Sequence, residues 1–134
     1  MKFTNPLYEL LYVSTLAPDQ QVTAVADIAR HARVMNSAAH ITGMLVFDGM
    51  RFCQQLEGTQ KQVLTLEQKI RADTRHINLQ VLYHGPLAQR RFRCFTMGYS
   101  MLDDSEVLAR LETMDGQAAV DSFLAMLPHI DLAP

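Results

Sequence analysis

Alternating apolar and polar positions predict five β-strands in this chain, because successive side chains of a strand point to opposite faces. The predicted strands cover residues 7–14, 40–47, 50–58, 78–84 and 91–102. The dipeptide Asp48-Gly49 separates the second strand from the third, and it favours a tight turn with positive φ at both central positions. These two strands are therefore expected to form a hairpin.

Apolar residues spaced three or four apart predict helices between the strands. One helix is expected over residues 18–36, since Pro18 suits a first helical turn. A second follows Thr59 and Gln62, which have the spacing of a capping box, and ends at Asp73. The order β-α-β-β-α-β plus one strand is the split βαβ pattern of ferredoxin-like folds. We expect an α+β sandwich, with a five-stranded mixed sheet and both helices on one face.

The second face of that sheet is apolar and needs cover, which the last part of the chain can supply. Asp103 and Glu106 form another capping-box pair, and the helix that they open runs to Leu111. Gly116 breaks this helix, and a further helical stripe precedes Pro128. These C-terminal helices pack either on the sheet or in an oligomer interface, for which the candidate residues are Phe123, Leu124 and Leu127.

Composition excludes several kinds of partner. The 134 residues carry a net charge of −2 without a basic or acidic tail, so neither nucleic acid nor an anionic membrane is expected. No apolar run is long enough to span a membrane, and the N-terminal stretch lacks a signal-peptide cleavage site. We expect a cytoplasmic protein, with Cys53 and Cys94 as two reduced, buried thiols in strands. The histidine spacing predicts no metal site.

One polar residue occupies an unexpected position. Gln54 falls among apolar residues on one face of its predicted strand, and in the predicted topology that face points at the two helices. Tyr12 points to the same side from the first strand. A buried amide without a partner costs about 1–3 kcal/mol, so Gln54 either makes a purely structural hydrogen bond or binds a polar ring system together with Tyr12. Asn36 is a possible third member, or simply a residue of the helix end.

Several motifs resemble the BLUF family of blue-light sensors that use a flavin. The matching stretches are LLYVS, VMNSAAHITGMLVFDGMRFCQQLEG, IRADTRH and QRRFRCFTMGYS. A single stretch of this kind would be weak evidence for the family, but the set occurs in the family's order and spacing over residues 7–101. The resemblance implies a ferredoxin-like fold with FAD or FMN held between the two helices. It also suggests residues 1–101 as the photosensor domain and residues 102–134 as a two-helix extension.

The resemblance gives individual residues their expected roles. Tyr12 corresponds to the photoactive tyrosine that donates an electron and a proton to the excited flavin. Gln54 corresponds to the switching glutamine, which rearranges its hydrogen bonds to the flavin after illumination. Asn36 corresponds to an asparagine on the C4=O and N3 edge of the ring, and Met97 to a methionine near Gln54. Further cofactor-binding positions implied by the family are Ser14, Lys69, Asp73, Arg75, His76 and Phe95.

Two positions depart from the family pattern. Phe95 stands where many members carry a tryptophan, and phenylalanine cannot hydrogen-bond to Gln54. An exchange between that tryptophan and Met97 cannot operate unchanged here. Gln55 follows Gln54 where relatives are often apolar, and strand alternation places it on the far face, away from the flavin.

The expected function is therefore a blue-light photoreceptor and not an enzyme. It should bind flavin non-covalently, form a homo-oligomer and signal to a separate effector protein. One alternative is a light-independent ligand-binding or interaction module on the same fold, in which Tyr12 and Gln54 are only structural. Another is an acylphosphatase-like hydrolase, which would need an anion-binding loop after the first strand, and the sequence shows no such loop. Three arginines in QRRFRC, residues 89–94, are expected to be solvated.

Overall fold

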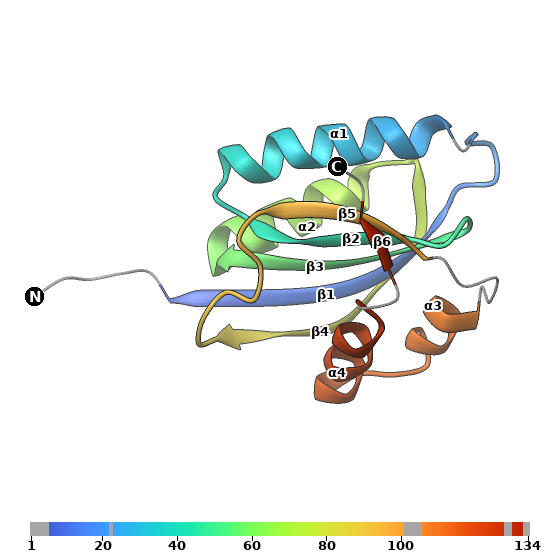
Figure 1. The fold of residues 1–134 in the computed structure, drawn as a ribbon. Helices are drawn as coiled ribbons and strands as arrows, with labels where there is room; N and C mark the ends of the chain where they lie inside the picture. Colours follow the sequence, from blue (N-terminus) through green and yellow to red (C-terminus); the bar gives the residue numbers. More distant parts are fainter. Residues whose placement is uncertain (1–5, 22, 101–105, 128–129, 133–134) are drawn as a thin grey trace, which may run out of the picture.

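A mixed β-sheet forms the centre of the protein in the computed structural model (Figure 1). The structure describes residues 6–21, 23–100, 106–127 and 130–132, and for residues 97–100, 106–107 and 130–132 only the backbone. Among these residues the strand order is β4-β1-β3-β2-β5-β6, with β2 and β5 parallel and the other neighbours antiparallel. The strands are β1 (Leu7–Leu16), β2 (Thr42–Phe47), β3 (Arg51–Thr59), β4 (His76–Leu87), β5 (Phe95–Ser100) and β6 (Ile130–Leu132).

Two long helices lie on one face of the sheet, α1 (Thr23–Ala38) and α2 (Gln60–Ala72) (Figure 1). Their apolar faces pack on alternate residues of the strands, including Leu10 and Leu45. The predicted ferredoxin-like α+β fold is confirmed, and the short strand β6 extends the predicted five-stranded sheet by one strand.

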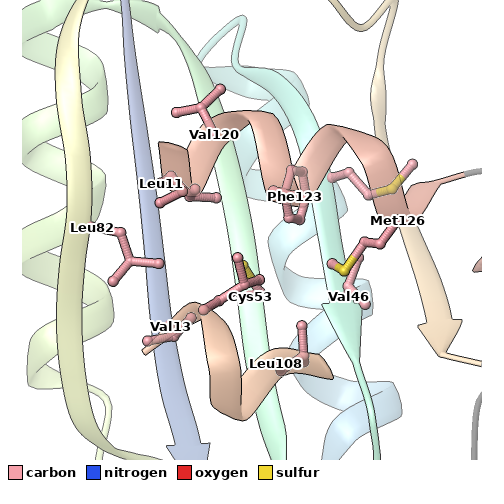
Figure 2. Packing of buried hydrophobic residues seen from close by; sticks show 12 residues of the cluster. Leu11, Val13, Val46, Cys53, Leu82, Leu108, Val120, Phe123 and Met126 are labelled. Carbon is pink, nitrogen blue, oxygen red and sulfur yellow. The ribbon is translucent and has the colours of Figure 1, made fainter. Parts of the chain in front are cut away.

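Helices α3 (Glu106–Leu111) and α4 (Gly116–Met126) cover the opposite face (Figures 1 and 2). Figure 2 shows Phe123 of α4 pointing at the side chains of β1, β2 and β3, and Phe123 is 0% exposed. Leu124 and Leu127 are partly buried against the same core. Phe123 therefore belongs to the core of one protomer and is unsuited to an oligomer interface. Gly116 is the first residue of α4, and the predicted cap Asp103 lies outside the described residues.

The start of α1 differs from the prediction. The helix begins at Thr23 and not at Pro18. Residues 17–20 form a turn instead, because the backbone N–H of Ala17 donates to Arg75 O at 3.0 Å and the N–H of Gln20 donates to Ala17 O at 3.0 Å. This turn ties the end of β1 to the start of β4.

The hairpin between β2 and β3 is present, but its turn is of another kind. Only Gly49 has a positive φ, at 103°, whereas the prediction required the same of Asp48. The Asp48 carboxylate accepts the backbone N–H groups of Met50 and Arg51, at 2.9 and 2.7 Å. This side chain stabilises a longer loop in which Asp48 keeps an ordinary backbone conformation.

Strand β5 begins at Phe95, later than residue 91 as predicted, because the preceding segment is held by a buried carboxylate. Glu57 is 0% exposed, and it accepts the backbone N–H groups of Arg91 and Phe92 at 3.0 to 3.2 Å. Those donors are consequently not available for a β-ladder. Cys94 lies in this loop and is exposed, so the prediction of two buried thiols is correct only for Cys53. No helix among the described residues is long and apolar enough to cross a membrane.

Candidate functional site

A cavity opens between α1 and α2 above the centre of the sheet. It leaves about 570 Å³ unfilled by protein atoms, including the part that opens to solvent. Its walls are mainly apolar side chains from the two helices and β2, namely Ile28, Ala32, Met35, Leu45, Leu66 and Ile70. Such a site suits a flat apolar ligand that also carries a few polar groups.

Tyr12 and Gln54 form a hydrogen-bonded pair on the sheet side of the cavity. Their Cα atoms are direct partners in the antiparallel β1–β3 ladder, so their side chains emerge next to each other on one face. The Tyr12 hydroxyl donates to Gln54 Oε1, and both residues line the cavity. Burial raises the pKa of the Tyr12 phenol far above its usual value, so this group stays protonated.

Asn36 faces the cavity from α1 with its polar atoms unsatisfied. The residue is 1% exposed, and neither its Nδ2 nor its Oδ1 atom has a hydrogen-bond partner. It does not end the helix, which continues to Ala38, although its backbone carbonyl accepts the N–H of Ile41 at 2.8 Å. A buried amide left in this state is typical of a site that a ligand completes.

The segment after α2 contributes a second polar group of residues. Arg75 donates from Nη2 to Asp73 Oδ2 at 2.7 Å and from Nε to Asp73 Oδ1 at 2.9 Å. The hydrogen bonds from Arg75 lower the pKa of Asp73, and the same contact raises the pKa of Arg75. His76 follows, with Nδ1 3.1 Å from Ser14 Oγ, and burial lowers its pKa. Since Asp73 balances the charge of Arg75, this pair supplies little net charge to the cavity.

Lys69 and His31 also line the cavity, from α2 and α1 respectively. Lys69 makes no hydrogen bond or ion pair with any residue that the structure describes, which leaves its ammonium group available to a ligand. His31 is not among the predicted site residues. The spacing of Ile28, His31 and Met35, three and then four residues apart, is the signal that could have placed it on the same helix face.

Several predicted positions lie outside this lining. Ser14 does not line the cavity, but its Oγ atom lies 3.1 Å from Nδ1 of His76, which does. Phe95 packs beside Tyr12 and Leu45 without lining the cavity. Met97 pairs with Leu45 through the backbone, and its side chain lies outside the described residues. Gln55 points to the opposite face, as the alternation of β3 requires, and its Nε2 donates to Glu9 Oε1 at 2.8 Å.

The fold and this site define a small α+β sensor domain with a ligand cavity between two helices. A family model described as BLUF, sensors of blue-light using FAD, matches residues 7–98. The chain belongs to this family of flavin-based blue-light sensors, which confirms the predicted resemblance and the prediction of a blue-light sensor.

Two curated relatives illustrate the match. The blue light- and temperature-regulated antirepressor BluF of Escherichia coli (strain K12) is 34% identical over 86 residues, which cover 64% of this chain and 21% of that protein. The photoactivated adenylate cyclase subunit alpha-like protein FB of Euglena gracilis is 31% identical over 126 residues, or 92% of this chain and 12% of that protein. The chain thus spans about a fifth or less of these relatives.

Solved structures agree with this assignment. The dark-state structure of the BLUF protein BlrB superposes with a TM-score of 0.78 at 27% identity, covering 93% of this chain and 97% of that chain. The ground state of BlsA gives a TM-score of 0.79 at 23% identity over 96% of this chain and 91% of that chain, which shows the shared fold.

Proposed function

We propose that Tyr12 and Gln54 form the light-responsive switch of this sensor, with FAD or FMN bound between α1 and α2. One observation carries the proposal: the Tyr12 hydroxyl donates to Gln54 Oε1 at a cavity where the buried side chain of Asn36 has no partner. The ring of a flavin is flat and apolar with a polar edge, and the cavity offers apolar walls and polar groups of that kind.

The residues present fit a flavin. Asn36 can donate and accept at once, as an imide edge requires, and Gln54 Nε2 is a donor beside it. Lys69 supplies a cation that no described residue neutralises. When bound, the flavin supplies absorption of blue light and a strong oxidant in its excited state.

The proposed light response depends on the hydroxyl proton of Tyr12 and on the side-chain amide of Gln54. Because burial keeps the Tyr12 phenol protonated, its loss of an electron is coupled to release of the hydroxyl proton. Gln54 Oε1 is the acceptor already in contact with that proton. When the electron and the proton have both returned to Tyr12, the Gln54 amide can remain rotated or as its tautomer, which changes the donors that Gln54 presents.

The test is an absorption spectrum of purified protein before and after blue illumination. The yellow protein should show a reversible red shift, and Tyr12→Phe and Gln54→Leu should stay yellow but lose it. Tyr8→Phe is a matched control, since Tyr8 lies on the same face of β1 but bonds to His84 away from the cavity. Gln55→Leu is the control for Gln54, because the adjacent amide faces the other side of the sheet.

A normal photocycle in Tyr12→Phe or Gln54→Leu would remove the role assigned to that residue. A colourless protein that takes up no added flavin would favour the light-independent interaction module. Chromatography of the released cofactor distinguishes FAD from FMN.

We also propose that the output passes to a separate effector protein in the cytoplasm. The names of two relatives describe a blue light-regulated antirepressor and a photoactivated adenylate cyclase subunit alpha-like protein, so both names connect light to a further activity. Both Cys53 and Cys94 are free thiols, as is usual in a reducing compartment. A homo-oligomer, if formed, would need a surface other than Phe123. Residues 1–101 and 102–134 remain our proposed sensor domain and extension.

A further inference from the structure

A second hollow lies on the other flank of α1, between this helix and the segment that leads into β5. It leaves about 980 Å³ unfilled by protein atoms, including the part open to solvent, and we call it the basic groove. Its polar lining comprises Arg33, Ser37, His40, Thr42, Arg90 and Arg93. The groove is separate from the flavin cavity, because Arg33 and Ser37 face away from the helix side that carries Ile28, His31 and Met35.

The charge of the groove is unbalanced within the described part of the chain. Its described lining includes three arginines and no carboxylate. Arg33 and Arg93 have no hydrogen bond or ion pair there. Elsewhere, five arginines pair with acidic side chains, in the pairs Arg30–Asp27, Arg51–Glu112, Arg71–Glu67, Arg75–Asp73 and Arg91–Glu9. Arg33 and Arg93 line the same hollow without an acidic partner among the described residues, so both guanidinium groups can bind an anion from outside.

One wall of the groove is fixed in advance. Arg90 Nη1 donates to Thr42 Oγ1 at 2.8 Å and to the backbone oxygen of Glu57 at 3.0 Å. The buried Glu57 carboxylate holds the next two residues of the loop through their backbone N–H groups. A wall that is already ordered loses little entropy when a ligand binds, which favours recognition by the free guanidinium groups beside it.

We propose that the basic groove binds an acidic segment of a partner protein through Arg33 and Arg93. Guanidinium groups bind carboxylates with two parallel hydrogen bonds, so aspartate and glutamate side chains match these residues. A nucleic acid fits less well, since domains that bind nucleic acids are usually strongly basic and this chain has a pI of about 6.2. The interpretation of the groove as the output surface of the sensor rests on the proposed function. Binding of an acidic segment to the groove does not depend on light.

The test measures binding of a fluorescein-labelled hexaglutamate peptide to the full-length protein in the dark, by fluorescence anisotropy. The double variant Arg33→Gln/Arg93→Gln should bind the peptide at least tenfold more weakly than wild type. The control Lys61→Gln/Arg71→Gln also removes two positive charges, but from α2, and its affinity should stay within twofold of wild type. Binding should weaken as salt rises from 0.05 to 0.5 M, because the Debye length falls from roughly 14 to 4 Å.

Cys94 gives an independent readout, because it lines the groove and is exposed while Cys53 is buried. Saturating peptide should slow alkylation of Cys94 by iodoacetamide at least threefold in wild type and leave it unchanged in Arg33→Gln/Arg93→Gln. Equal loss of binding in both double variants, or tighter binding of a single-stranded oligonucleotide than of the peptide, would overturn the proposal. The photocycle is recorded separately, so failure of the groove and failure of the flavin switch can be told apart.

Discussion

Asn36 is a buried side chain whose two polar atoms both lack partners. Within the protein alone this arrangement is unfavourable, since a buried amide without hydrogen bonds costs about 1–3 kcal/mol. Its position on the cavity wall explains why the residue is tolerated, because a ligand with a donor and an acceptor would satisfy it.

Replacing Asn36 with an apolar residue should therefore stabilise the flavin-free protein and weaken its binding of flavin. Asn36→Leu has a similar volume and should raise the free energy of unfolding of the flavin-free protein by about 1 kcal/mol, because it removes the unsatisfied amide. Flavin affinity should fall about tenfold, which corresponds to the loss of one or two hydrogen bonds. Urea unfolding and flavin titration measure the two effects. A variant less stable than wild type and equally good at binding flavin would contradict this interpretation.

His76 should make stability depend on pH in a defined window. Burial lowers its pKa below the ordinary 6.5, so the unfolded chain binds a proton more readily than the native protein. With respect to His76, the free energy of unfolding is therefore highest above about pH 6.5, and it decreases as the pH falls from there toward the lower native pKa. Asp73 affects stability in a lower pH range. Because its native pKa is lowered, the stability that its carboxylate contributes is lost only below about pH 4.

Urea midpoints at pH 7.5 and 5.5 check this prediction. Wild type should lose more stability between these values than His76→Gln, which has no proton to gain. His31→Gln, which removes an exposed histidine of the same cavity, should keep the wild-type difference. An identical pH dependence in wild type and His76→Gln would exclude the role of burial.

At the scale of elements, the β2–β3 ladder depends on one close backbone contact. Gly43 has a φ of 147°, and a Cβ atom placed there would lie 1.9 Å from the backbone oxygen of Gln55. Gln54 is the residue before Gln55 in β3, so a shift of the β3 backbone at this contact would also move Gln54. The absence of a side chain at Gly43 thus helps to position the proposed switch residue.

Gly43→Ala should accordingly destabilise the protein by more than about 3 kcal/mol, or prevent folding, because β2 and β3 must move apart. Gly49→Ala is the matched control: it also has a positive φ, at 103°, but a Cβ atom there meets nothing within 4 Å. That variant should lose only about 1–2 kcal/mol. Circular dichroism melts of both proteins make the comparison, and equal losses would show that the contact with Gln55 is unimportant.

At the scale of the whole molecule, the sheet separates two interiors. One contains the cavity with Tyr12, Gln54 and Asn36, and the other is a closed core under α3 and α4 (Figure 2). Gln54 and Gln55 are consecutive residues that face these two interiors. A shift of the β3 backbone at Gln54 would also move Gln55, whose side chain lies on the face that carries the C-terminal helices.

Phe123→Ala tests whether α4 serves as a cover for the sheet. Because Phe123 is fully buried among residues of β1, β2 and β3, its truncation should cost about 3–5 kcal/mol. The mass of the folded protein in light scattering should stay unchanged, since this side chain is not on a surface. Leu124→Ala, at a partly buried position, should cost less. A change in mass with little loss of stability would instead point to an interface.

The strand pattern and the helix stripes predicted the order of the elements and the two faces of the sheet. Side-chain periodicity and the ferredoxin-like topology together placed Tyr12 and Gln54 on one side of the sheet, whereas Asn36 was assigned to the site through the resemblance to the BLUF family. The start of α1, the turn at Asp48 and the late start of β5 could not be predicted. Each depends on a contact distant in sequence or on a side chain that binds the backbone, and such contacts leave no periodic pattern.

The fold class, the hairpin, the polar pair on an apolar face and the family could all be predicted from the amino-acid order, since periodicity and motifs are local properties of the chain. Which charged side chains have partners, in contrast, depends on the three-dimensional fold. It paired Arg75 with Asp73 and buried Glu57 under the loop, while Arg33, Lys69 and Arg93 were left without partners in the described chain. Charge pairing depends on distances between side chains in space, and a linear pattern does not contain those distances.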